Sequence, residues 1–105
     1  MNRTSLIQQV RAKKKARIIA YLKEAFKGFA CPVYLFGSYA NETFHGNSDV
    51  DILVISPQAL LSENYREACN KMSDLGLDYD ILMANSHANL NQSIVNSLQK
   101  INFLP

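Results

Sequence analysis

The chain has 105 residues, a formal net charge of +2 and a hydrophobic share of 48%. This length suits one small domain, and so small a charge gives no argument for nucleic-acid binding. No apolar run approaches a membrane span, and no signal-peptide core follows the N-terminus. Cys31 and Cys69 form no metal-ligand spacing and no disulfide framework, so we expect reduced thiols. We therefore expect one domain over residues 1–105, located in the cytoplasm.

A long helix is expected first. Ser5 to Gln8 fits a capping box, helix formers continue to Phe26, and Gly28 stands where helices commonly end. The apolar stripe is clear only in the second half of this helix, at Ile18, Leu22, Ala25 and Phe29. We expect the packed part to begin near Ile18, with residues 1–17 forming a basic extension that projects or faces a partner.

A basic run occupies this extension, from Arg11 through three lysines to Arg17. One interpretation is a solvated helix face, which is how most charge runs behave. The other is a docking surface for RNA or for an acidic partner. The sequence leaves both interpretations open.

Strands and helices alternate along the remainder of the chain. Short apolar, β-rich segments predict strands over 32–36, 49–56 and 77–83. Helices are predicted just after Ser38, from between Pro57 and Ser62 to Leu75, and from Ser86 to about Gln99. A short edge strand is predicted at Ile101, Phe103 and Leu104. The second strand is apolar on both faces, as in a central strand covered on both sides.

The residues with the clearest functional potential lie between positions 35 and 55. Gly37 permits a sharp turn and a close approach to a ligand, and Ser38 is a preferred helix N-cap, which would direct free N–H groups at an anion. Asp49 and Asp51 are two residues apart in a strand-like segment, so their carboxylates should share a face. An anion-binding turn beside paired carboxylates suits a phosphate-bearing substrate carried on a divalent metal.

Two motifs carry a family resemblance. Gly37-Ser38, ten residues and then Asp49-Val50-Asp51 resemble the signature of the polymerase-β-type nucleotidyltransferase superfamily. Within it, GSYA…SDVDILV resembles the minimal nucleotidyltransferases, the MNT antitoxins encoded beside HEPN toxins. The resemblance covers about residues 32–83. It implies the α/β (α+β) nucleotidyltransferase fold, with a small mixed sheet of three to four strands and helices packed on one side.

The resemblance also implies an activity. Members transfer a nucleoside monophosphate, usually AMP from ATP, to an acceptor hydroxyl and release pyrophosphate. In the antitoxin group the acceptor is typically a tyrosine of the HEPN-type toxin partner, and its modification silences the toxin. A neighbouring gene for a helical protein with an Arg-x4-His-x-Tyr motif would fit such a partner.

Site residues transfer from the family motif position by position. Asp49 and Asp51 would bind two Mg²⁺ ions, and a third metal-binding and catalytic carboxylate comes from the next strand. Asp80 matches the pattern of an Asp that enters an apolar strand, and Asp78 remains an alternative. Gly37 and Ser38 would bind the β- and γ-phosphates of the nucleotide through backbone N–H groups and the hydroxyl.

The motif departs from the family at two positions. Many members read Gly-Ser-x-Ala-Arg-Gly, whereas Asn41 and Glu42 replace the Arg and Gly here. The loss of a cation and the gain of an anion near a triphosphate leave two other hypotheses open. One is a weak or inactive module that neutralises its partner by binding alone. The other is a transferase acting on tRNA or a small molecule.

Overall fold

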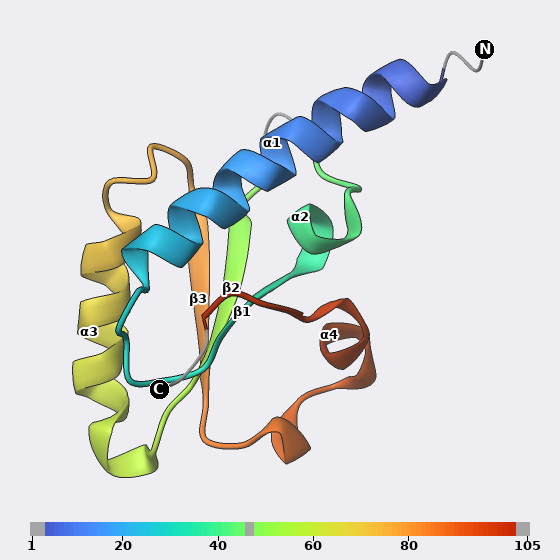
Figure 1. Ribbon diagram of the computed structural model, residues 1–105. Coiled ribbons are helices and arrows are strands. Elements are labelled where there is room, and N and C mark those ends of the chain that lie inside the picture. The colour runs from blue at the N-terminus through green and yellow to red at the C-terminus, as the bar shows by residue number, and fades with distance from the viewer. Residues whose placement is uncertain (1–3, 46–47, 103–105) are drawn as a thin grey trace.

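The computed structural model describes residues 4–45 and 48–102. Helices and strands alternate along the chain, as the sequence predicts (Figure 1). The elements are α1 (Thr4–Ala25), β1 (Val33–Phe36), α2 (Gly37–Asn41), β2 (Val50–Ile55), the 3-10 turn η1 (Gln58–Leu60), α3 (Leu61–Met72), β3 (Tyr79–Ala84), the 3-10 turn η2 (His87–Asn89), α4 (Gln92–Ser97) and β4 (Gln99–Lys100).

The strands form one mixed sheet in the order β3-β2-β1-β4. β1 is antiparallel to both of its neighbours, β2 and β4, whereas β2 and β3 are parallel. The parallel pair is joined through α3, which is the helical crossover that parallel strands require. A small mixed four-stranded sheet with helices is the predicted fold class, which the structure confirms.

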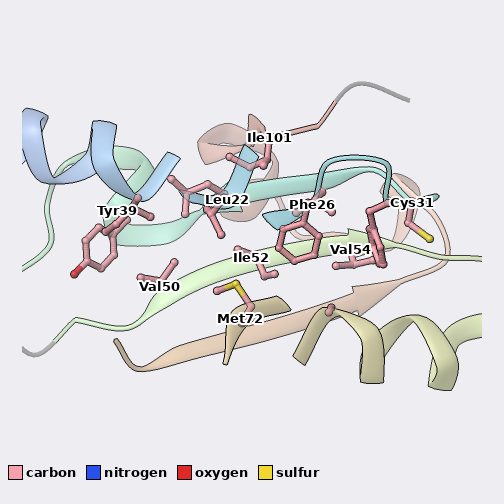
Figure 2. Close-up of a cluster of buried hydrophobic side chains, with 14 of the residues drawn as sticks. Leu22, Phe26, Cys31, Tyr39, Val50, Ile52, Val54, Met72 and Ile101 are labelled. Atoms are coloured by element: carbon pink, nitrogen blue, oxygen red, sulfur yellow. The ribbon is translucent and has the colours of Figure 1, made fainter. Parts of the chain in front are cut away.

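The main core lies between one face of this sheet and the helices α1 and α3 (Figure 2). Leu22 from α1, Phe26 just after its end and Met72 from α3 are completely buried against Val33 and Val54 of the sheet. Burying an aliphatic or aromatic side chain of this size contributes about 1.5–3 kcal/mol. The apolar stripe predicted in the second half of α1 is therefore the face that anchors this helix, and Ile18 is its first buried apolar residue among those described.

The opposite side of the sheet carries the C-terminal segment with α4, so the helices are not all packed on one side, in contrast to what the resemblance implied. Figure 1 shows α3 and α4 on opposite sides of the β2–β3 pair. α4 contacts α2 and β1, and the His87 ring lies against the Tyr34 ring, with Nε2 3.2 Å from the phenolic oxygen. Leu53, which points away from the main core residues Ile52 and Val54, is fully buried. β2 is thus covered on both faces, as its apolar sequence predicts.

The predicted helix from Ser86 to Gln99 is wrong, because two shorter pieces, η2 and α4, replace it. Leu90 between them has an extended backbone (φ −90°, ψ 144°). Each piece has its own cap: Ser86 Oγ accepts from the Ala88 N–H, and Asn91 Oδ1 accepts from the Ile94 N–H. Polar side chains that satisfy free N–H groups start new helices, which explains the interruption.

The predicted edge strand is displaced toward the N-terminus. β4 consists of Gln99 and Lys100, paired with Leu35 and Tyr34. Ile101 follows the strand as a buried core residue, and Phe103 and Leu104 lie outside the described residues. In the part of the chain that the structure describes, no helix has the length and apolar character needed to cross a membrane.

Candidate active site

A row of three paired residues crosses the sheet at the end where β1 stops and the parallel strands begin. Phe36 of β1 pairs with Asp51 of β2, and Asp51 pairs with Asp80 of β3. Adjacent strands lie about 4.8 Å apart, so the two aspartates are direct neighbours on one face. Asp49 is exposed in the segment that leads into β2. The fold thus brings together Asp51 and Asp80, which are far apart in the sequence.

Asp51 shows the electrostatic cost of this arrangement. Its pKa is raised above the usual value, first by burial and then by the negative charges of Asp80 and Asp49. Burial and like charge both disfavour an ionised carboxyl, and a bound cation would reverse the second effect. The three predicted carboxylates therefore share one electrostatic environment. Asp80 contributes more than Asp49 to the effect on Asp51.

Asp78, the alternative third carboxylate, lies just before β3 and is exposed. Its backbone carbonyl accepts a hydrogen bond from the Val50 N–H at 2.9 Å, which closes the first rung of the β2–β3 pair. Asp80, by contrast, is in register with Asp51 inside the strands. Of the two aspartates, Asp80 is therefore the one that lies directly beside Asp51.

Gly37 lies directly against Asp51. Its φ of +74° is in the left-handed region, and an ideal Cβ placed on it would be 2.6 Å from Asp51 Oδ2. Real Cβ atoms essentially never come so close to another heavy atom, so a side chain here would displace the carboxylate. Glycine is needed at this position twice over, for its backbone conformation and for the space it leaves.

The expected role of Ser38 as N-cap is wrong. α2 begins at Gly37, and its N-cap position is Phe36, which has an extended backbone and no side-chain cap. The strand runs to Phe36 and Gly37 turns the chain at once, so Ser38 already lies in the first helical turn. The Gly37 N–H already donates a hydrogen bond to Ser97 Oγ at 3.2 Å. Ser38 is the second residue of α2.

Ser97 is a site-forming residue that sequence reasoning missed. It is buried, and its hydroxyl donates to the Ile94 carbonyl at 3.1 Å while accepting from Gly37. It thereby ties the end of α4 to the turn beside Asp51. A serine in a polar C-terminal segment gives no local signal of such a contact.

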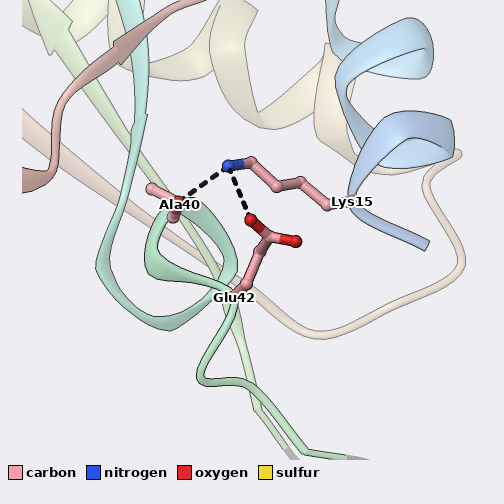
Figure 3. A network of polar contacts seen from close by, with 3 residues as sticks. All are labelled: Lys15, Ala40 and Glu42. Carbon is pink, nitrogen blue, oxygen red and sulfur yellow. Dashed lines mark hydrogen bonds and ion pairs between the residues drawn. The ribbon is translucent and has the colours of Figure 1, made fainter. Parts of the chain in front are cut away.

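Lys15 is the second missed residue, and it lies within the basic run. Its Nζ donates to the Ala40 carbonyl at 2.8 Å and lies 3.9 Å from Glu42 Oε2 (Figure 3). A cation at the C-terminal end of a helix is favourable, and here it also neutralises Glu42. Lys14, next to it, lies 5.7 Å from the ring centres of Tyr39 and Phe44, which stack on each other. Part of the basic run therefore holds α2 in place.

Glu42, one of the two departures from the family pattern, ends α2 in a left-handed conformation with φ 58° and ψ 31°. Glycine adopts this conformation most easily, which accounts for its occurrence at this point of the motif. The charge of Glu42 is paired with Lys15 rather than left alone near the site. Asn41 is exposed.

The carboxylates suit a hard divalent cation such as Mg²⁺, which prefers oxygen ligands. Among the residues with described positions, no three His, Cys, Asp or Glu side chains are already grouped closely enough to hold a metal ion. The shared electrostatic effect on Asp51, and its register with Asp80, nevertheless place the donors within reach of one another. The chemistry of these oxygen donors is of the kind that a magnesium site requires.

Comparison with known proteins gives a family and a fold. The nucleotidyltransferase domain family matches residues 15–104. No curated protein matches the chain. A proposed nucleotidyltransferase from Sulfolobus solfataricus, solved by crystallography, is similar in fold, with a TM-score of 0.53 and 20% identity over 86% of this chain and 84% of that one.

Two further crystal structures are of toxin–antitoxin complexes. One contains AMP-PNP and has a TM-score of 0.48 with 25% identity, over 83% of this chain and 71% of that chain. The other is a mutant of the MntA-HpeT complex, with a TM-score of 0.47 and 23% identity over the same shares of the two chains.

Proposed function

Because the chain belongs to the nucleotidyltransferase domain family, which matches residues 15–104, we propose that it transfers AMP from ATP to a hydroxyl of a protein acceptor. The acceptor in this proposal is a tyrosine of a HEPN-type toxin partner, and the protein acts as the antitoxin. The choice of acceptor rests on the resemblance of GSYA…SDVDILV to the minimal nucleotidyltransferase antitoxins.

One observation carries the proposal: Gly37 lies against Asp51, and Asp51 is in register with Asp80. The turn at Gly37 and the paired Asp51 and Asp80 then lie at one end of the sheet, with Asp49 in the segment that leads into β2. Structural aspartates at a strand end would gain nothing from this crowding, which raises the pKa of Asp51. A site that receives a cation with its substrate gains directly, because the cation removes the repulsion.

Asp49, Asp51 and Asp80 would hold the two Mg²⁺ ions. When bound, these ions supply charge neutralisation for the triphosphate and for the attacking and leaving oxygens. Asp80, which is exposed, also receives the proton of the acceptor hydroxyl. The acceptor oxygen forms the new bond to the α-phosphorus, and the bond from that phosphorus to pyrophosphate breaks. Gly37 provides the close approach, and the Ser38 hydroxyl binds a phosphate oxygen.

The pairing of Glu42 with Lys15 supports an active site over a degenerate one. An unpaired anion beside the nucleotide would repel the triphosphate. With Nζ of Lys15 3.9 Å from the carboxylate and hydrogen-bonded to Ala40, that repulsion is reduced. The main effect of Glu42 is then its contact with Lys15 at the end of α2, and it adds little net negative charge near the nucleotide.

Intact-mass spectrometry tests the proposal. The candidate toxin, a helical protein with an Arg-x4-His-x-Tyr motif, is incubated with this protein, ATP and Mg²⁺. We expect its mass to increase by one or more AMP groups, and the increase to disappear when Asp49→Ala and Asp51→Ala are combined. Asp80→Asn should abolish the increase, whereas Asp78→Asn, at an exposed carboxylate outside the strand register, should retain it.

Two negative outcomes would favour other functions. A stable complex without any mass increase would refute AMP transfer and favour a module that neutralises its partner by binding. Neither a complex nor a mass increase would refute the toxin as acceptor and direct the search to tRNA and small hydroxyl compounds.

A further inference from the structure

The first half of α1 projects from the body of the protein (Figure 1). The molecule measures 52 × 30 × 27 Å along its principal axes, and α1 extends along the longest direction in the picture. Leu6, Ile7 and Val10 in this half are exposed by 67%, 60% and 61%, whereas the first buried apolar residue described in α1 is Ile18. We call residues 6–13 the arm and Leu6, Ile7 and Val10 the apolar patch.

The apolar patch occupies one side of the arm. At 100° per residue, positions i, i+1 and i+4 fall within about a 100° sector of a helix. Single exposed aliphatic residues are ordinary on protein surfaces, but three on one side of a projecting helix present a continuous surface for another protein. The patch contributes little to the packing of α1 against the described residues, because its members remain more exposed than buried.

The basic residues between positions 11 and 17 of α1 divide into two groups. Lys14 and Lys15 turn inward, to the Tyr39 and Phe44 rings and to Ala40 and Glu42. The other group is exposed or half-buried and has no ion pair with an acidic side chain within the described part of the chain. It consists of Arg11, Lys13 and Arg17. These cations border the apolar patch along the helix.

The arm adjoins the catalytic end of the sheet. A hollow of about 550 Å³ is lined by Gln8, Gln9, Arg11 and Ala12 of α1 and by Asn41 and Glu42 at the end of α2. α2 begins at Gly37, which lies against Asp51. A protein held by the arm would therefore rest next to the site, where its acceptor side chain could reach it.

We propose that the arm, together with Arg17 about one turn beyond its end, is the docking surface for the acceptor protein. The apolar patch packs into an apolar groove on that protein, and Arg11, Lys13 and Arg17 face acidic side chains on the rim of the groove. Charge complementarity selects an acidic partner, and the apolar centre selects a protein over RNA, because phosphates gain nothing from aliphatic side chains. This inference rests on the proposed function, since it gives the acceptor protein its binding surface.

Titration calorimetry with the candidate toxin tests the docking surface. Replacing the patch by Leu6→Gln, Ile7→Gln and Val10→Gln keeps helix-forming side chains of similar length. We expect the Kd for the toxin to rise by at least about 30-fold, as for the central residues of an interface. The control replaces three other exposed apolar residues on different elements by Gln (Leu60, Tyr65 and Val95, which are 39–47% exposed), and it should leave the Kd within about threefold of the wild type.

A charge variant tests the rim. Arg11→Glu, Lys13→Glu and Arg17→Glu should raise the Kd by about 10-fold or more at low salt and reduce its dependence on salt concentration. Reversal of three other exposed lysines (Lys23, Lys27 and Lys100) is the control. Binding of ATP with Mg²⁺ should be unchanged in the patch variant, since Leu6, Ile7 and Val10 neither belong to the site nor line the hollow beside it.

The outcomes separate docking from catalysis. An unchanged Kd in the patch variant, or an equal loss in its control, overturns the docking surface and leaves AMP transfer standing. Loss of complex formation in the patch variant, together with a wild-type complex that acquires no AMP, supports the docking surface and refutes the transfer. Loss of binding to a short single-stranded RNA in the charge variant, with toxin binding intact, overturns the protein partner in favour of RNA. No complex with the wild-type chain overturns the docking surface, and the mass increase of the toxin then decides separately whether AMP is transferred.

Discussion

Gly37 lies so close to Asp51 that any side chain at position 37 would clash with the carboxylate: an ideal Cβ on Gly37 would lie 2.6 Å from Oδ2 of Asp51. The carboxylate can occupy its position beside the turn only because residue 37 has no side chain. The conformation of the turn, with φ +74° at Gly37, imposes the same requirement independently. A substitution at Gly37 would therefore affect both the stability of the turn and the position of the Asp51 carboxylate. These two effects can be separated by experiment.

The first prediction concerns Gly37→Ala. Left-handed backbone costs an L-residue about 1–2 kcal/mol, and the new Cβ would also push the Asp51 carboxylate away. We expect a fall of at least this size in the free energy of unfolding, measured in urea, and a loss of ATP binding in the presence of Mg²⁺, measured by calorimetry.

Gly76→Ala provides the matched control for this change. Gly76 has nearly the same φ, +79°, but nothing lies within 4 Å of an ideal Cβ there. It should show the loss of stability from backbone strain and keep its affinity for ATP. Equal loss of ATP binding in both variants would mean that the Gly37–Asp51 contact has no special part in the site.

The second prediction is that Asp51→Asn stabilises the metal-free protein while abolishing transfer. Burial and the charges of Asp80 and Asp49 raise the pKa of Asp51, so its ionised form opposes folding. We expect the variant to unfold at a higher temperature than the wild type in EDTA at neutral pH. Mg²⁺ with ATP should stabilise the wild type and not the variant, because ligands stabilise only the state that binds them.

The pH dependence of the wild type follows from the same shift. Between the ordinary carboxyl pKa and the raised pKa of Asp51, the folded state binds the proton more readily than the unfolded state. The metal-free protein should therefore gain stability from Asp51 as the pH falls through this window, and Asp51→Asn should remove that gain. Glu67→Gln, at an exposed carboxylate of α3, should leave the gain in place. An unchanged pH profile in Asp51→Asn would contradict the prediction.

The third prediction is that Glu42→Gly increases stability. Glu42 has φ 58°, a conformation that costs a residue with a side chain about 1–2 kcal/mol. The substitution also removes the partly exposed ion pair with Lys15, which is worth about 0–1 kcal/mol. The net result should be a gain of up to about 1 kcal/mol in the free energy of unfolding, measured by chemical denaturation.

Thr43→Gly is the control for this effect. Thr43 is also exposed, but among the described non-glycine residues only Glu42 has a positive φ. Glycine at position 43 should therefore lower stability by about 0.5–1 kcal/mol through the entropy of the unfolded chain. A gain in both variants, or a loss in both, would show that the left-handed conformation of Glu42 is not what controls stability here.

The fourth prediction concerns Asn102→Ala. The Asn102 side chain is buried, accepts from the Val33 N–H at 2.8 Å and donates to the Cys31 carbonyl at 2.7 Å. Its removal leaves two buried backbone groups without partners, each costing about 1–3 kcal/mol. We expect the free energy of unfolding, measured in urea, to fall by about 2–4 kcal/mol. The control is Asn96→Ala, which should cost less than about 0.5 kcal/mol because the Asn96 side chain only accepts a hydrogen bond from the Gln92 side chain at an exposed position. Similar losses in the two variants would count against this role for Asn102.

The sequence by itself determined the order of the elements and the character of their faces. The stripe at Ile18 and Leu22 predicted which part of α1 would be buried, and apolar residues on both faces of β2 predicted a covered central strand. Gly37 and the Asp49–Asp51 spacing pointed to one region of the chain. These features are local, because helix and strand periodicities repeat within a few residues and apolar burial follows them directly.

Only the tertiary structure decided which distant groups meet. The parallel pairing of β2 with β3 places Asp80 beside Asp51. Hydrogen bonds across 25 and 60 positions connect Lys15 to Ala40 and Ser97 to Gly37. A single polar side chain leaves no periodic trace in the sequence, and its partner is selected by where the packed elements end. The division of the basic run into inward lysines and outward cations has the same origin: the burial of α1 at Ile18 determines its rotation, and the rotation determines which charges reach α2.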